Sequence, residues 1–447
     1  MNDTGAHTVM NAVHQSLGAT SDLMRQHIQG FGTTYQLMYL DTVVDEKLIQ
    51  DRLLEPFYKM QQQGTYRTYL QSIALPVADM NAEIVTRKLL EGFAAIAFDT
   101  IYLIDVRKHW EAKPLEAAIE KVIQGPQTGF SESLPLNIGI LRTHYPQPTL
   151  QVESFKVGKL SQTPIVIAYD RRMTDPKLLD KVRQAITSVN VDVVQGIGQL
   201  QSAMNCQKYS LFPKMLLTER PDRAVHSVAQ GKIVLLGEGF PFGAILPVVF
   251  YDFISSMEDT YQSYWVSRFL VALRYFGLFI SVSLPALYVG VTAFNPEIFR
   301  VQLALSIAGS RVSVPYPAFI EVLFMLVMME LLTEASIRLP KTIGSTATTV
   351  GGLILGQAAT EAGLVSNIMI IIVSVVAISN FVIPINTMSF SIRVIKYVIL
   401  TLTIMFGMIG LIFGLLGIVA YLIQLESFGQ PYFKLYIKDT YKHKRSA

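Results

Sequence analysis

Charge falls away abruptly along this chain. Only 12 of the 156 residues at positions 269–424 are charged, against 52 of the first 268. A run of about 20 apolar residues is long enough to cross a bilayer. The pattern therefore predicts a charged N-terminal part followed by an all-α polytopic transmembrane domain.

Five apolar segments divide the second part, at residues 275–294, 318–332, 349–365, 368–385 and 397–423. The last has no charged residue and predicts one long helix. The third is rich in Gly, Ala and Thr, which suits close helix packing or a re-entrant segment.

Basic residues indicate orientation, because cytoplasmic loops carry an excess of Lys and Arg. The tail is basic and is predicted to be cytoplasmic; its cations are Lys434, Lys438, Lys442, Lys444 and Arg445. The N-terminal part has no signal-peptide pattern at its start and is also predicted to be cytoplasmic. If both ends of the chain lie in the cytoplasm, the number of membrane spans must be even. Four spans with a re-entrant third segment satisfy this condition. This topology places Arg393 and Lys396 on the outer side.

The N-terminal part contains two similar stretches that begin at Tyr35 and Pro164. Each reads as an apolar strand that ends in an aspartate, then an aspartate N-cap, then an amphipathic helix. The paired aspartates are Asp41 with Asp170 and Asp45 with Asp175. A second pair of stretches aligns Gly92 with Gly231, each as a helix C-cap before a buried strand.

The predicted architecture is therefore an α/β cytoplasmic domain of two similar strand–helix subdomains, followed by the helical membrane domain. The boundaries are expected at residues 1–145 and 146–267 for the subdomains, 268–424 for the membrane domain and 425–447 for the basic tail.

Catalytic and metal-binding patterns are missing from the sequence. There is no GxSxG or HExxH motif, and the GPQTGF segment lacks the ending of a phosphate loop. Cys206 is the only cysteine, which excludes a disulfide scaffold and suggests an inert thiol. Asp41 and Asp170 are better explained as turn or helix-cap residues than as ligands. No enzyme activity, cofactor or metal is expected, and a net charge of +3 does not indicate nucleic-acid binding.

Four stretches resemble the A subunit of GerA-type spore germinant receptors of endospore-forming bacteria. They are VIQGPQTGFSESLPLNIGILR, LFPKMLLTERPDRAVHSVAQGKIVLL, YPAFIEVLFMLVMMELLTEASIRLP, and VGGLILGQAATEAGLVS followed by FVIP. Gln127 and Thr128 depart from the family, which often has Arg-Glu-like residues after the Gly-Pro pair.

The resemblance implies a multi-pass subunit of the spore inner membrane that assembles as a ring, a pentamer, around a cation pore. It implies a transporter-like B subunit that binds nutrient and a lipoprotein C subunit. Opening of the pore would release monovalent cations, above all potassium, and start germination.

The second apolar segment carries a stripe of side chains on one helix face. Since an α-helix advances about 100° per residue, five residues fall within about 80° of one another: Ile320, Leu323, Val327, Glu330 and Glu334. Repeated around a ring, the stripe predicts an apolar gate followed by acidic rings. The alternatives are ion pairs of Glu330 and Glu334 with Arg338 or Lys341 at the membrane surface, and helix–helix contacts. Glu321 lies off the stripe.

Two further features of the membrane part have predicted roles. Glu361 is expected to be another buried carboxylate. Gly407, Gly410, Gly414 and Gly417 are spaced for helix packing.

Two other functions remain open at the level of sequence. A small-solute secondary transporter usually shows two related membrane halves, and no such symmetry follows residue 269. A non-conducting membrane scaffold or signalling subunit is the third possibility.

Overall fold

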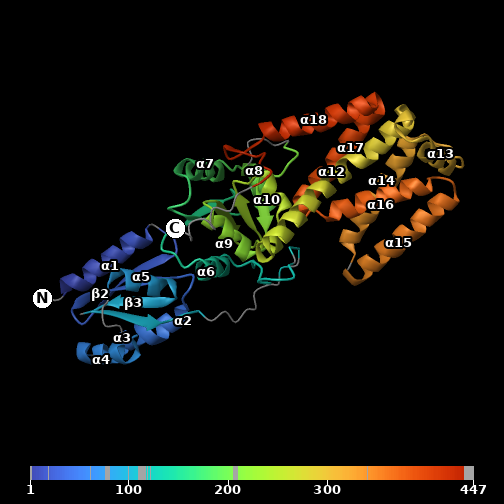
Figure 1. Ribbon diagram of the computed structural model, residues 1–447. Coiled ribbons are helices and arrows are strands. Elements are labelled where there is room, and N and C mark those ends of the chain that lie inside the picture. The colour runs from blue at the N-terminus through green and yellow to red at the C-terminus, as the bar shows by residue number, and fades with distance from the viewer. Residues whose placement is uncertain are drawn as a thin grey trace. The chain divides into compact units, whose positions relative to one another are not determined.

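The structure is a computed structural model, and it describes residues 3–436 apart from 19, 61, 76–80, 99, 109–116, 118, 121, 205–209 and 340. At residues 3–5, 33, 337 and 341–348 it describes the backbone alone. The chain divides into two compact units (Figure 1). The first comprises Met1–Tyr209, Lys214–Val248 and Ser427–Gln430, and the second Ser210–Pro213, Val249–Glu426 and Pro431–Ala447.

The first unit begins with a four-stranded antiparallel sheet in the order β1-β2-β3-β4. Both faces of the sheet are covered, since the consecutive residues Leu37 and Met38, which point to opposite faces, are both buried. The strands are β1 (Leu23–Gly30), β2 (Thr33–Leu40), β3 (Phe93–Ala97) and β4 (Ile101–Asp105). The helices are α1 (Asp3–Leu17), α2 (Glu46–Ile49), the π-helix η1 (Gln50–Leu54), α3 (Glu55–Lys59), α4 (Gln63–Ile73) and α5 (Ala82–Leu90).

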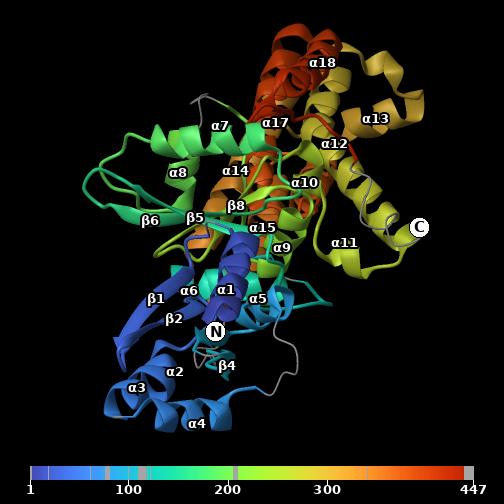
Figure 2. The same ribbon diagram turned by 90° about the vertical axis from the view of Figure 1, so that its left-hand side faces the viewer.

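A second antiparallel sheet follows in the same unit, in the order β5-β6-β8-β9-β7. Its strands are β5 (Leu150–Val157), β6 (Thr163–Asp170), β7 (Leu216–Thr218), β8 (Ile233–Gly237) and β9 (Gly243–Leu246). The helices are α6 (Leu134–His144), α7 (Pro176–Thr187), α8 (Ile197–Met204) and α9 (Pro221–Ala229) (Figure 2).

The predicted repeat is confirmed, since β1-β2-β3-β4 and β5-β6-β8-β9 follow the same plan. Asp45 accepts a hydrogen bond from the Lys47 amide, and Asp175 from the Lys177 amide, both at 2.9 Å, so each caps the helix after the second strand.

The two aligned glycines have positive φ, 92° at Gly92 and 83° at Gly231. An added Cβ would lie 2.9 Å from the Val43 carbonyl oxygen at Gly92, and 2.4 Å from the Met173 carbonyl oxygen at Gly231. Val43 and Met173 each lie three residues after the end of the second strand. The same close contact therefore recurs in both subdomains.

A fully buried ion pair joins the two subdomains. Arg142 on α6 donates to both carboxylate oxygens of Asp22 at 2.9 and 2.7 Å, and also to Thr20 and the Leu150 carbonyl. The Asp22 side chain is 3% exposed and that of Arg142 0%. Burial by itself raises the pKa of Asp22, but the charge and hydrogen bonds of Arg142 outweigh it and lower the pKa below its ordinary value.

The described part of the second unit is helical except for short end segments. Its helices are α10 (Phe250–Ile254), α11 (Glu258–Tyr261), α12 (Tyr264–Phe294), the 3-10 helix η2 (Pro296–Ile298), α13 (Val301–Ser310), α14 (Ala318–Arg338), α15 (Lys341–Glu361), α16 (Asn367–Phe381), α17 (Asn386–Phe406) and α18 (Met408–Gln424). β10 (Glu426–Ser427) and β11 (Gln430–Pro431) follow α18. The central helix α12 packs against α14, α16, α17 and α18.

The prediction of one long helix over residues 397–423 is wrong. Gly407, with φ 63° and ψ −145°, ends α17 and begins α18, and the two helices pack against each other. The hairpin needs glycine at one further position, because a Cβ on Gly410 would lie 2.1 Å from the Leu402 carbonyl oxygen. A Cβ on Gly414 would lie 3.3 Å from Leu402 Cδ1, the flexible end of a side chain. Gly417 has open space around it.

Among the described residues, α12 and α17 are the two helices that are long and apolar enough to cross a membrane. α13, α16 and α18 are apolar but shorter. α14 has the length, but it carries the carboxylates of Glu321, Glu330 and Glu334. The small-residue segment is a regular helix, α15, up to Glu361.

Replacement of Arg142 by Met is expected to destabilise the first unit by about 3–5 kcal/mol, because it leaves the buried Asp22 charge without its partner. The matched control is Arg183→Met, which breaks a pair with Glu153 whose arginine side chain is 38% exposed and is expected to cost less than about 1 kcal/mol. Urea unfolding of the purified chain, read by hydrogen exchange of the β1 and β5 amides, compares the two variants. Equal losses of unfolding free energy in the two variants would contradict the conclusion that the buried Asp22–Arg142 pair stabilises the unit.

The same pair predicts an acid dependence of stability. The folded-state pKa of Asp22 lies below its ordinary value of 3.8, so its contribution is complete above that pH and is lost as the pH falls through the folded-state value. The pKa of Asp170 is lowered likewise. The stability gap between the wild type and Arg142→Met is expected to narrow below about pH 4. A gap that stays constant on acidification would contradict this.

Candidate functional site

Helix α14 has one face packed inside its unit and one face exposed. Val322 and Leu326 on the packed face are fully buried. The exposed face carries a line of four apolar side chains that are 40–57% exposed, Ile320, Leu323, Val327 and Leu331, and continues at Glu334. We call these five residues the α14 stripe. The stripe predicted from the sequence has Glu330 at the position that Leu331 occupies in the structure.

Glu330 turns away from the stripe towards α17. Its carboxylate accepts hydrogen bonds from Arg393 Nε at 2.7 Å and from Lys396 Nζ at 3.1 Å. The Lys396 side chain is 0% exposed. The two cations that the sequence-based topology placed on the outer side are thus partners of Glu330. The group of three carries a net charge of +1.

Glu334 makes the pair that sequence analysis had considered for it. Arg338 donates to its carboxylate at 2.7 Å, one turn further along α14, and both side chains are more than half exposed. The other partner considered, the side chain of Lys341, lies outside the described residues. Glu334 is therefore the carboxylate of α14 that faces outwards.

Glu321, which lies off the stripe predicted from the sequence, is the most buried carboxylate of the helix. It accepts hydrogen bonds from the Ser366 amide at 2.6 Å and the Ser366 hydroxyl at 2.5 Å. Ser366 is the N-cap of α16, and a helix N-terminus favours a nearby negative charge. Arg311 Nε lies 3.3 Å from the other carboxylate oxygen. Glu321 thus joins the start of α14 to the start of α16.

These contacts fix how α14 is rotated. Glu321 and Glu330 tie the helix to α16 and α17, because a carboxylate in an apolar helical unit is costly without a partner. The stripe must then face outwards. The exposed face of α14 therefore combines an apolar row with one accessible carboxylate, Glu334.

Glu361 is a correction to the sequence-based prediction. It is the last residue of α15, its side chain is exposed, and it accepts a hydrogen bond from Gln357 at 3.0 Å. It is not a buried carboxylate of the helical unit, because its side chain points to the exposed side of the last turn of α15, together with Gln357. Glu321 fills that description.

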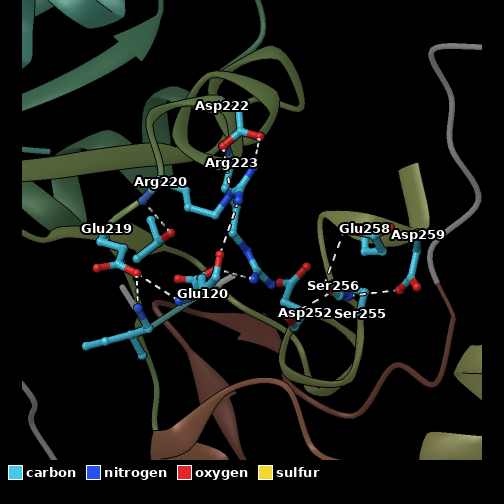
Figure 3. A network of polar contacts seen from close by, with 12 residues as sticks. Glu120, Glu219, Arg220, Asp222, Arg223, Asp252, Ser255, Ser256, Glu258 and Asp259 are labelled. Atoms are coloured by element: carbon cyan, nitrogen blue, oxygen red, sulfur yellow. Dashed lines mark hydrogen bonds and ion pairs between the residues drawn. The ribbon is translucent and has the colours of Figure 1, made fainter. Parts of the chain in front are cut away.

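The first unit has a polar network around Arg220, whose residues Glu120, Glu219, Arg220, Asp222 and Arg223 are labelled in Figure 3. The buried Arg220 pairs with Asp222 at 2.6 Å and donates to the carbonyls of Glu120 and Pro126. Arg223 donates to the Glu120 carboxylate at 2.9 Å, and Glu219 accepts from the Glu120 amide at 2.8 Å. These residues of the TERPDR segment hold the connection between the two subdomains in place.

The aspartates considered as ligands have structural partners. Asp170 is fully buried and accepts from Tyr145, Thr149 and the Arg172 amide at 2.6–2.7 Å. Burial raises the pKa of the Asp41 carboxyl, and the nearby negative charge of Glu46 raises this pKa further.

The described residues hold no group of three or more His, Cys, Asp and Glu side chains that could bind a metal. Cys206 and the tail cations Lys438, Lys442, Lys444 and Arg445 lie outside the described residues.

Comparison with known proteins gives a consistent result. The model of the family described as "Bacillus/Clostridium GerA spore germination protein" matches residues 11–446. Spore germination protein B1 of Bacillus subtilis is 31% identical over 96% of this chain and 91% of its own length. The uncharacterized membrane protein YfkQ of the same organism is 34% identical over 93% of this chain and 82% of its own length.

Among solved structures, the N-terminal domain of the A subunit of the Bacillus megaterium spore germinant receptor GerK3 matches 54% of this chain and 94% of that domain. The identity is 21% and the TM-score 0.40. The match of the family model over nearly the whole chain shows that this protein belongs to the Bacillus/Clostridium GerA spore germination family.

Proposed function

We propose that this chain is a membrane subunit of a spore germinant receptor, in which several copies form a nutrient-gated cation channel that triggers germination. The observation that carries the proposal is the α14 stripe. Its four apolar side chains lie on the exposed face of a helix that Glu321 and Glu330 tie to its neighbours. A second copy, or the axis of a ring of copies, would meet this face.

The stripe has the composition of a gate. Val327 lies in its middle, with Leu323 one turn before and Leu331 one turn after. Branched apolar side chains that meet around an axis repel water, and a narrow apolar constriction closes a channel by dewetting. Around a ring the stripe would form stacked apolar layers that end at a ring of Glu334.

The carboxylates of the helix have separate roles in this proposal. Glu330 shares its charge with Arg393 and Lys396, so it cannot supply a free negative ring. Glu334 is more than half exposed, and its partner Arg338 is exposed as well. Pairs of this kind contribute little to stability. Glu334 is therefore the residue proposed to attract cations, potassium above all, and Glu330 the one that positions the helix.

The ends of the helical unit support the proposed topology. The amide of Phe250, before α12, donates to the Tyr432 carbonyl at 2.8 Å, and the Tyr251 amide donates to the Lys434 carbonyl at 3.1 Å. The chain thus enters and leaves the unit at the same place, which favours an even number of crossings. We place the chain in the spore inner membrane with its N-terminal domain in the cytoplasm.

The proposed complex contains further parts. The chain would form a homo-oligomer, a pentamer, together with a transporter-like B subunit and a lipoprotein C subunit. The first unit would serve subunit contact and gating rather than catalysis. Crosslinking in native membranes tests the oligomer, and a chain that stays monomeric there argues against it.

Ion flux separates this proposal from a non-conducting scaffold and from a solute transporter. The purified oligomer is reconstituted into liposomes loaded with potassium, and efflux is followed with a potassium electrode. Efflux that saturates with solute and requires its co-transport would identify a transporter. No flux from a correctly assembled receptor, with its nutrient present, would leave the scaffold.

Replacement of Val327 by Ala is expected to make the closed channel leaky, because shorter side chains widen the apolar ring and lower the cost of wetting. Spores would lose potassium without nutrient and germinate early or fail to mature. The matched control is Val398→Ala on α17, since Val398 is also about half exposed but lies off the stripe. If both variants stay tight at normal protein level, the conduction path lies elsewhere.

Neutralisation of Glu334 and of Glu330 is expected to have different effects. Glu334→Gln keeps the fold and lowers cation flux, because it removes the accessible charge. Glu330→Gln leaves the buried Lys396 without a counter-charge and lowers the amount of assembled protein, at a cost of about 3–5 kcal/mol. Protein level by immunoblot and potassium flux are measured in the same spores. The opposite pattern, with Glu330→Gln stable and Glu334→Gln lost from the membrane, would reverse the two roles.

A further inference from the structure

The buried group of Glu330, Arg393 and Lys396 is not electrically neutral. Two cations and one carboxylate leave it with a net charge of +1. The Lys396 side chain is 0% exposed and that of Arg393 16%. Among the described residues, Glu330 and Arg393 are the charged groups that interact with Lys396. Because a buried charge without a counter-charge is strongly destabilising, the group requires one more negative charge.

A hydroxyl without a hydrogen bond lies beside the same cations. The Tyr397 hydroxyl is buried and has no hydrogen-bond partner among the described residues. Its electrostatic interactions with Glu330 and Arg393 place it at this group, and the Lys396 ammonium lies 5.1 Å from the centre of the Tyr397 ring. A buried hydroxyl that makes no hydrogen bond also costs free energy. One bound group could supply both the negative charge and the acceptor for the hydroxyl proton.

The donors at this group match an anion. Lys396 donates one hydrogen bond to Glu330, and an ammonium has three N–H donors. Arg393 donates to one Glu330 oxygen through Nε and through one of its terminal nitrogens, and a guanidinium has five N–H donors. Among the described residues, donors of both cations and the Tyr397 hydroxyl therefore remain for one further acceptor. An ionised acceptor makes the strongest hydrogen bonds with such donors.

Burial limits the size of this anion. Arg393 is the exposed edge of the group, and its guanidinium lies over the Phe390 ring at 5.3 Å. The neighbouring surface of α17 is apolar, with Phe390 48% and Val394 52% exposed. A lipid headgroup or a peptide carboxylate would need a wider opening than an arginine edge that is 16% exposed. A small monovalent ion fits better, and its charge of −1 makes the group neutral.

We infer that a halide ion such as chloride binds between Lys396, Arg393 and the Tyr397 hydroxyl and neutralises the excess charge of the group. The inference rests on contacts within the helical unit and not on the proposed channel activity. The bound ion would stabilise the contact between α14 and α17, because it offsets the repulsion between the two cations.

Chlorine NMR tests the site, because the resonance of dissolved chloride broadens when the ion exchanges with a site on a protein. The full chain is placed in potassium chloride, in nanodiscs of phosphatidylcholine, a lipid without net charge. Lys396→Met leaves the neutral pair of Glu330 and Arg393, so we expect it to fold and to lose part of the broadening. The matched control is Arg338→Met, which removes an exposed cation and is expected to keep the broadening of the site. Equal broadening by wild type and Lys396→Met would overturn the inference.

Thermal unfolding of the wild type gives a second measurement that needs no variant. Exchange of gluconate for chloride at the same ionic strength is expected to raise the melting temperature by about 2–4 °C when chloride is at about five times its Kd. The melting temperature of Lys396→Met is expected not to change. A wild type that does not respond to chloride overturns the anion site.

The same measurement distinguishes other sources of the negative charge. Phosphatidylglycerol is added to the nanodiscs in gluconate. If this lipid raises the melting temperature of the wild type and chloride does not, a lipid phosphate neutralises the group and the halide is overturned. If Lys396→Met melts well above the wild type in chloride, Lys396 has no counter-ion and the inference is overturned as well.

Discussion

The helical unit depends on one constraint: a charge inside an apolar bundle must have a partner in the same bundle. Glu330 meets it through Arg393 and Lys396, and Glu321 through Ser366 and Arg311. An unpaired carboxylate or ammonium at such a position costs several kcal/mol. Both contacts connect α14 to its neighbours, so they set the rotation of the helix about its own axis.

That rotation has a functional consequence. With Glu321 and Glu330 turned inwards, the apolar residues at spacings of three and four must face outwards, and Glu334 is left as the accessible carboxylate. In the function proposed above, this surface acts through contact, wetting and charge, so its residues are tested by ion flux and assembly rather than by enzymatic turnover.

The first unit follows the same rule in a different setting. Asp22 and Arg142 form a fully buried pair between the subdomains, and Arg220 holds the backbone of the connecting segment through two carbonyls. Each subdomain repeats the same order of two strands, helices and two further strands, and local features of the sequence stabilise this order in both copies. The aspartate caps and the two positive-φ glycines occupy equivalent positions in both copies.

Local patterns in the sequence determined much of this protein. The loss of charge after Arg268 separated the helical part, and the Asp41/Asp170 and Gly92/Gly231 alignments predicted the repeat, because caps, turns and periodicity depend on neighbouring residues. Tertiary structure decided what depends on distant partners. The sequence could not show that Glu330 meets cations more than sixty residues away, that Glu321 binds the N-cap residue of α16, or that Glu361 is exposed. The uncharged stretch also did not predict that the helix ends at Gly407. Hydropathy indicates burial in lipid or protein, but it carries no information about the backbone angles that separate α17 from α18.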